Sequence, residues 1–158
     1  MKNYLIVIIF SLLTGCAASG PKFTVLMSPK NDQGVLYVYR PYTFTNGGVA
    51  PYVYINGKER GELKNQGYLV YPLSAGQYSV ATDGSFLTWT PGRAEVLVTI
   101  KPGHRSYVRL ASHIRSMNIS TGLVMTGATL QEVDESLARQ ELPETRLSVD
   151  ADEIKATK

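Results

Sequence analysis

The most regular alternation of side chains in the chain lies in Gly34–Arg40, whose sequence is GVLYVYR. Alternate positions of a strand point to opposite faces of a sheet. One face of this segment therefore carries valine and two tyrosines, and the other carries leucine and valine. Because both faces are apolar, the segment predicts a central strand that is buried on both sides.

A hairpin follows a loop at Pro41–Pro51. Tyr52–Ile55 and Lys58–Leu63 are separated by Asn56-Gly57, and this dipeptide is typical of a type I′ turn, in which both central residues have positive φ. Gly67–Pro72 and Gln77–Thr82 predict two further strands.

Ala94–Ile100 and Arg105–Ala111 predict a second hairpin across Lys101-Pro102-Gly103. With these, seven candidate strands follow one another at even spacing with tight turns. This is the pattern of a single, mainly β domain, an antiparallel β-sandwich of about seven to eight strands.

The pattern weakens from Ser112 to Gly127, and the residues after it allow two interpretations. Thr129-Leu-Gln-Glu132 has the form of a capping box that would begin a helix. Alternatively, Ala128–Val133 is a last strand and Asp134 caps one short helix that ends before Pro143. We favour the second interpretation.

The first residues have the anatomy of a secretory signal peptide. Lys2 supplies a positive start, Tyr4–Leu13 is almost wholly apolar, and Leu13-Thr14-Gly15-Cys16 resembles the bacterial lipobox, in which the cysteine is acylated and the leader is cut before it. The apolar run is far shorter than the roughly 20 residues of a membrane-spanning helix. We therefore predict a lipid anchor on Cys16. By resemblance to Gram-negative lipoproteins, Ala17 in place of aspartate implies the outer membrane. We expect attachment on its periplasmic side, although lipidation by itself fixes the attachment and not the side.

These features divide the chain into a leader (1–15), a lipidated N-terminus and tether (16–33), a β-sandwich domain (34–147) and a disordered tail (148–158). The tether follows from the small, polar and proline-marked sequence of Ala17–Lys30. Cys16 is the single cysteine, so the domain relies on packing rather than on disulfides. The net charge of +3 is scattered, which argues against a nucleic-acid partner.

The order of motifs resembles a family of small bacterial lipoproteins that share a domain of unknown function. The resemblance rests on the segments Gly34–Pro41, Tyr54–Lys58, Gly61–Leu63, Gly67-Tyr68, Leu73–Tyr78, Tyr107–Leu110, Leu130–Glu135 and Leu142–Leu147. It implies a β-sandwich-like domain and a location in the cell envelope, and it implies no activity. A looser similarity is to surface repeats with a Pro-Glu-Gly-Ala signature, where this chain has Leu73-Ser-Ala-Gly76 instead.

The sequence contains no recognisable catalytic motif, so we expect a protein that is not an enzyme and has no cofactor or metal. His104 and His113 lack a second ligand at metal-binding spacing. Asp32, Asp83 and Asp134 are isolated in turn or cap positions. No Gly-x-Ser-x-Gly elbow or phosphate-binding loop occurs.

Three aromatic residues stand in irregular segments, namely Tyr42, Phe44 and Trp89. Such residues can anchor a protein interface or stack on sugar rings. They can equally fold back as lids over the open ends of a sandwich, because a domain without disulfides needs its aromatic side chains in the core. We favour the lid interpretation and keep the three as tentative binding residues.

The expected function is a lipid-anchored interaction or structural module that docks on another envelope protein. The alternative is a binder of peptidoglycan, another glycan or a small ligand through Tyr42, Phe44 and Trp89. Exposed strand edges such as Lys58–Leu63 offer a partner strand a place to pair.

Overall fold

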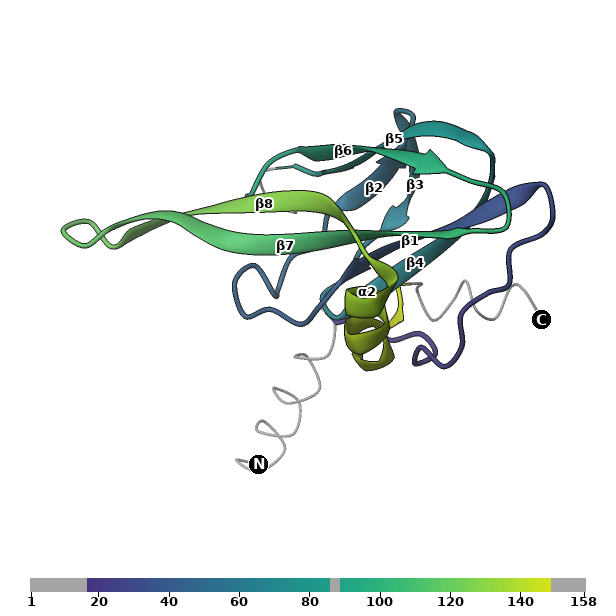
Figure 1. Ribbon diagram of the computed structural model, residues 1–158. Helices are drawn as coiled ribbons and strands as arrows, with labels where there is room; N and C mark the ends of the chain where they lie inside the picture. Colours follow the sequence, from purple (N-terminus) through teal and green to yellow (C-terminus); the bar gives the residue numbers. More distant parts are fainter. Residues whose placement is uncertain (1–16, 86–88, 149–158) are drawn as a thin grey trace, which may run out of the picture.

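Two stacked β-sheets and one short helix make up the fold (Figure 1). The computed structural model describes residues 17–85 and 89–148. In the described residues, the first sheet has the strand order β8-β7-β1-β4-β9 and the second β3-β2-β5-β6. The elements are β1 (Gln33–Arg40), β2 (Tyr52–Ile55), β3 (Lys58–Glu62), β4 (Gly67–Ser74), β5 (Gly76–Asp83), β6 (Ala94–Ile100), β7 (Arg105–Asn118), β8 (Leu123–Val133), α2 (Glu135–Glu141), the 3-10 helix η2 (Leu142–Glu144) and β9 (Arg146–Leu147).

The prediction of a central strand buried on both faces is confirmed for β1. The strand lies between β7 and β4, and each residue from Gly34 to Arg40 is buried. Leu36 and Val38 point into the inter-sheet core, while Val35, Tyr37 and Tyr39 form part of a second apolar cluster. That second cluster, here called the outer core, is covered by α2 and η2 (Figure 1).

The mainly β sandwich is confirmed, but its first sheet is mixed rather than antiparallel. β1 pairs in parallel with β7, and β4 pairs in parallel with β9. Nine strands are assigned in the described residues, against the seven to eight expected. The additional strand is the two-residue β9, which is too short to give a periodic signal.

The second hairpin predicted from sequence is wrong. β6 pairs with β5 in the second sheet, whereas β7 pairs with β1 and β8 in the first. The turn at Lys101-Pro102-Gly103 therefore carries the chain across the core from one sheet to the other. A proline-glycine turn indicates that the chain reverses its direction, but it does not indicate which strand pairs with each of the two flanking strands.

Two local predictions are confirmed by backbone geometry. Asn56 and Gly57 both have positive φ, 50° and 76°, between β2 and β3. Asp134 caps α2 by accepting a hydrogen bond from the backbone N–H of Leu137 at 2.8 Å. The favoured interpretation of the C-terminal part therefore holds, although the strand before the cap begins at Leu123 rather than at Ala128.

The segment expected to be a free tether lies against the domain instead. Ala18 and Gly20 are buried, and their backbone N–H groups donate to the carbonyl oxygens of Asn65 and Leu147 at 3.0 and 3.2 Å. Phe23 packs edge-on against two tyrosines of the outer core. The composition of the segment favoured a tether, but its apolar side chains fill a gap in the outer core.

The disordered tail predicted for residues 148–158 does not begin at its first residue. Ser148 is buried, its N–H donates to the carbonyl oxygen of Tyr68 at 2.9 Å, and its Oγ accepts from the N–H of Lys64 at 3.2 Å. The rest of the predicted tail and the predicted leader lie outside the described residues.

An ion pair fastens α2 to the first sheet. Arg109 of β7 donates to both carboxylate oxygens of Glu141 at 2.8–3.1 Å, and the Tyr39 hydroxyl donates to the same carboxylate at 2.7 Å. Burial by itself raises the pKa of Glu141, but the hydrogen bonds from Arg109 and Tyr39 outweigh it, so the pKa lies below its usual value.

We expect Glu141→Gln to lower the free energy of unfolding by about 1–2 kcal/mol at pH 7, because it removes a charged hydrogen-bond acceptor. A carboxyl whose pKa is depressed by folding stabilises the fold above its unfolded pKa, about 4.3. This contribution disappears as the pH falls through the lower, folded pKa. The difference between wild type and variant in urea unfolding should therefore shrink between pH 5 and pH 3. The exposed Glu144→Gln serves as the control, and a difference that is independent of pH would contradict the assignment.

Candidate interaction surface

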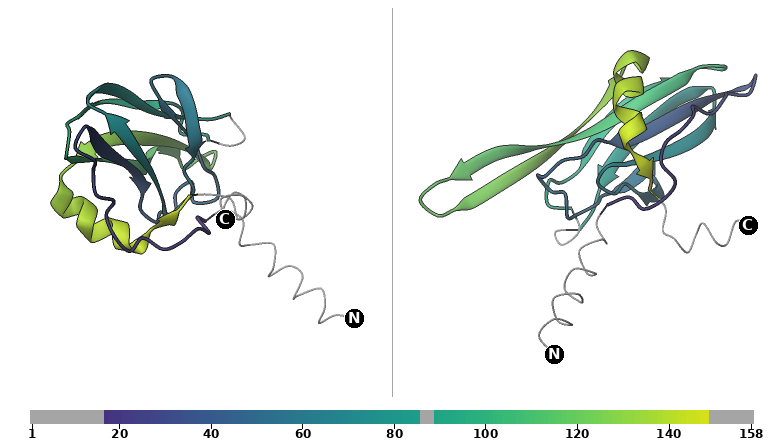
Figure 2. Two further views of the ribbon diagram at one scale, coloured as in Figure 1. Left: turned by 90° about the vertical axis from the view of Figure 1, so that its right-hand side faces the viewer. Right: turned by 90° about the horizontal axis from the view of Figure 1, so that it is seen from below.

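A long β-hairpin extends beyond the sandwich and ends far from the rest of the domain (Figures 1 and 2). It consists of the last residues of β7 and the first of β8, paired from Ile114 and Thr126 to Asn118 and Leu123. We call residues 114–126 the arm. Its turn is well specified, because the Asn118 side chain accepts hydrogen bonds from the N–H groups of Ser120 and Thr121 at 3.0 and 3.2 Å.

The arm carries an unusual number of exposed apolar side chains. Ile119 at its turn is 90% exposed. The other exposed large apolar residues of the arm are Ile114, Met117, Leu123, Val124 and Met125. Exposed apolar clusters of this kind are typical of interaction surfaces.

One side of the arm continues the core-facing side of the first sheet. Leu130 pairs with Leu110 in the inter-sheet core. Counting back in steps of two along β8, Val124 lies on that same side and pairs with Met117. The second sheet does not reach this far, so this side of the arm has no sheet opposite it (Figure 1). By the same alternation, Leu123 and Met125 lie on the other side of the arm.

A second surface is formed by Pro41–Pro51, here called the aromatic loop, which is held from below by a buried arginine. The Arg40 side chain donates to the carbonyl oxygens of Val49 and Asn46 at 2.8 and 2.6 Å and stacks on the Trp89 ring at 5.2 Å. Burial lowers the pKa of Arg40 to about 10, so the guanidinium remains charged at neutral pH. Its position beneath the loop fixes the loop backbone.

Side-chain amides fix the loop from its flanks. Asn65 accepts from the N–H of Thr43 at 3.1 Å and donates to its carbonyl oxygen at 3.0 Å. Asn46, which has a positive φ of 58°, accepts from the hydroxyl of Thr126 at the base of the arm at 3.3 Å. A Cβ atom at Gly47 would lie 2.6 Å from the carbonyl oxygen of Thr43, so only glycine fits there. These hydrogen bonds and the steric constraint at Gly47 therefore fix the backbone of the loop.

The three aromatic residues singled out from sequence do not form one surface. Tyr42 and Phe44 are 67% and 91% exposed on the aromatic loop. Trp89 is 1% exposed, belongs to the inter-sheet core, and donates from its indole N–H to the carbonyl oxygen of Gly92 at 2.8 Å. The lid interpretation thus describes Trp89, which is not accessible to a ligand, and it does not describe the other two. The predicted lipidation site Cys16 lies outside the described residues.

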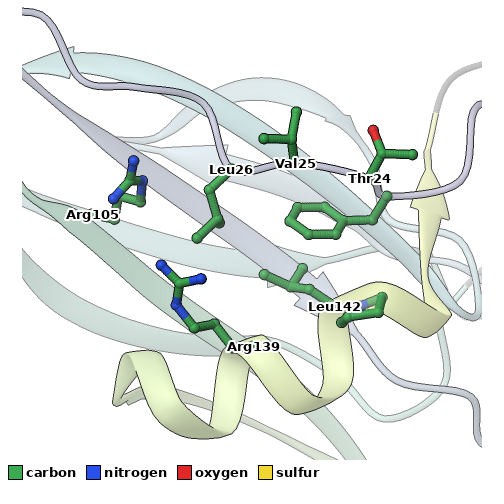
Figure 3. A pocket seen from close by; sticks show the side chains of 8 residues that line it. Thr24, Val25, Leu26, Arg105, Arg139 and Leu142 are labelled. Atoms are coloured by element: carbon green, nitrogen blue, oxygen red, sulfur yellow. The ribbon is translucent and has the colours of Figure 1, made fainter.

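A pocket of about 400 Å³ opens between residues 23–26 and the helices α2 and η2 (Figure 3). Arg105 of β7 and Arg139 of α2 are among its lining residues (Figure 3). Both guanidinium groups are already engaged, since Arg105 donates to the carbonyl oxygen of Met27 at 3.0 Å and Arg139 pairs with Glu135. The pocket is the gap left where the N-terminal segment crosses the helix.

The rings of His104 and His113 lie against neighbouring backbone. His104 Nδ1 lies 2.7 Å from the carbonyl oxygen of Pro102, and the His113 ring lies over Gly127 on the neighbouring strand. Within residues 17–85 and 89–148, no three His, Cys, Asp or Glu side chains are grouped so as to hold a metal ion. The same part of the chain contains no helix with the length and apolar character to cross a membrane.

The arm was missed in the sequence because its strands lack a clear alternation of apolar and polar residues. The available signal was the turn itself. Asn118, which accepts hydrogen bonds from the turn backbone, stands four residues before Gly122, which has a positive φ of 67°. These two residue types at a chain reversal favour a hairpin.

The family described as Protein of unknown function (DUF2846) matches residues 30–123. The match spans β1 to β7 and ends in the arm, so the resemblance noted for Leu130–Glu135 and Leu142–Leu147 lies outside it. No curated protein and no solved structure matches the chain significantly. Since the match covers more than half of the sequence, the chain belongs to the DUF2846 family of proteins of unknown function.

Proposed function

We propose that this protein is a lipid-anchored, non-enzymatic interaction module of the bacterial outer membrane that docks on another envelope protein through its arm. The observation that carries the proposal is the group of exposed apolar residues on a hairpin that extends past the sandwich. The anchor rests on the lipobox-like Leu13–Cys16, and acyl chains on Cys16 would attach the chain to the periplasmic leaflet.

The arm suits a protein partner in two ways. A two-stranded ribbon is marginally stable by itself, so burying its apolar side chains against a partner stabilises both the ribbon and the complex. β8 is also an edge strand of the first sheet, and its free backbone groups can pair with a strand of the partner. Met117 and Met125 add flexible side chains that adapt to irregular surfaces.

A photo-crosslinking residue at position 117 in the full-length chain tests this proposal in cells. We expect a discrete protein adduct, identified by mass spectrometry, that is lost when Ile119→Asp is added to the same chain. The melting temperature should change little, because Ile119 is exposed. The matched control carries the crosslinker at Leu97, which is exposed on β6 of the other sheet. Equal adducts from both positions, or none from position 117, would argue against docking through the arm.

Binding to peptidoglycan is the second candidate, and it loses one of its three predicted residues because Trp89 is buried. Tyr42 and Phe44 remain exposed and are the side chains left to stack on sugar rings. Co-sedimentation with purified peptidoglycan tests it. Sedimentation that is no greater than that of an unrelated lipoprotein would remove this candidate.

A further inference from the structure

We infer that the aromatic loop is a membrane contact, with Phe44 and Tyr42 resting in the headgroup region of the bilayer that holds Cys16. The inference rests on the proposed lipid anchor and adds to it an orientation of the domain on the membrane. It is carried by the position of the loop beside the first described residues.

Asn65 links the loop to the start of the described chain. Its carbonyl oxygen accepts from the N–H of Ala18 at 3.0 Å, and Ala17 forms a β-bridge with it. Its side chain holds the backbone of Thr43, the neighbour of Phe44. The views in Figures 1 and 2 both show the loop beside the point where the described chain begins.

This link leaves little slack between an anchor and the domain. Cys16 is joined directly to Ala17 in the sequence, and consecutive Cα atoms are about 3.8 Å apart across a trans peptide. Ala17 is itself paired with Asn65 of the domain, and Ala18 and Gly20 are buried. A leaflet that holds the acyl chains of Cys16 is therefore held close to the aromatic loop.

The loop exposes its aromatic side chains from a fixed backbone. The buried Arg40 and the Asn65 amide hold the loop from two directions, and Gly47 has no room for a side chain. Phe44 nevertheless points out of the domain, with 91% of its surface exposed.

The chemistry of the loop fits a lipid surface. None of the residues Pro41–Pro51 is charged, so the loop can approach the headgroups without removing an ionised side chain from water. Aromatic rings are favoured at the membrane–water interface, where the tyrosine hydroxyl remains hydrated and the apolar ring is buried. Phe44, which is 91% exposed, and Tyr42 two residues before it present this combination.

The inference is tested with the full-length acylated chain in vesicles of phosphatidylethanolamine and phosphatidylglycerol. Phe44→Cys is labelled with an environment-sensitive fluorophore, and lipids brominated near the headgroup serve as the quencher. We expect strong quenching at position 44 and none at Leu97→Cys, which lies on the outer face of the second sheet. Ile119→Cys reports on the arm in the same way, and quenching there would contradict a protein partner for the arm.

Mass spectrometry of the mature chain separates the two possible failures. If Cys16 carries acyl groups and position 44 is not quenched, the loop inference is overturned while the anchor stands. If the wild-type chain carries no acyl groups at position 16, like the Cys16→Ser control, the proposed lipid anchor is wrong. A response of the probe to peptidoglycan or to a purified envelope protein, without quenching by lipid, also overturns the inference and assigns the loop to that ligand.

Discussion

Replacing Trp89 by alanine is expected to lower the free energy of unfolding by about 3–5 kcal/mol, the usual range for removing a buried tryptophan. The ring is 1% exposed in the inter-sheet core and lies against the Arg40 guanidinium. Its loss leaves a cavity and uncovers a buried cation that supports the aromatic loop. Urea unfolding followed by circular dichroism measures the effect, which is large against the 5–15 kcal/mol that stabilises a typical domain.

Phe44→Ala is the control, since it removes an aromatic ring from the aromatic loop. Because Phe44 is exposed, we expect its free energy of unfolding to stay within about 0.5 kcal/mol of wild type. A loss at Phe44 comparable to that at Trp89 would show that both rings are core residues in solution. The assignment of Phe44 to a contact surface would then be wrong.

Leu142→Ala is expected to cost about 2–5 kcal/mol of stability, the range for removing a buried leucine side chain. Leu142 is the first residue of the 3-10 helix η2, which follows α2, and its side chain is fully buried in the outer core. Its removal weakens the packing of the helix and of the N-terminal segment on the first sheet at once. Thermal unfolding measures the loss, and limited proteolysis of the native protein should release the N-terminal segment sooner.

Leu123→Ala provides the corresponding control on the arm. The substitution is chemically identical, but Leu123 is exposed, so stability should change by about 0.5 kcal/mol or less. If Leu142→Ala were as mild as Leu123→Ala, the helical face of the first sheet would contribute no core. The domain would then be held by the inter-sheet core alone.

The parts of the fold that could be predicted depend on local chemistry. The turn at Asn56-Gly57 follows from the positive φ that these residues tolerate, and the start of α2 follows from the side-chain cap of Asp134. β1 was recognised because apolar side chains on both faces of one segment require cover on both sides. None of these inferences needs to know which distant residues lie nearby.

The parts that could not be predicted depend on partners far away in the sequence. β6 and β7 have the same alternation whether they pair with each other or with β5 and β1, so their turn could not assign them to a sheet. The docking of the segment after Ala17 depends on a gap between α2 and the first sheet, which no local pattern reports. The residue in the sequence that indicates this docking is Phe23, because a large aromatic side chain is unusual in a solvent-exposed tether.

In the candidate site, the sequence singled out Tyr42 and Phe44 for their place in a loop, but the same reasoning included Trp89. The difference between them is set by Arg40, whose side chain occupies the space beneath the loop and draws the tryptophan ring under it. An arginine at the end of an apolar strand reads as a solvated residue, and its burial follows only from the assembled sandwich.

The hydrogen bonds between the two ends of the described chain also constrain the order in which the domain can form. Gly20 donates to the carbonyl oxygen of Leu147, and Leu147 donates back to that of Pro21. A chain that emerges from a ribosome or a translocon does so from its N-terminus, so these early residues must wait for β9, nearly the last element, before they can pair. Contacts over such long separations slow folding. Until β9 forms, Gly20 and Pro21 lack these backbone partners, and loss of residues 146–148 would return the domain to that unfinished condition.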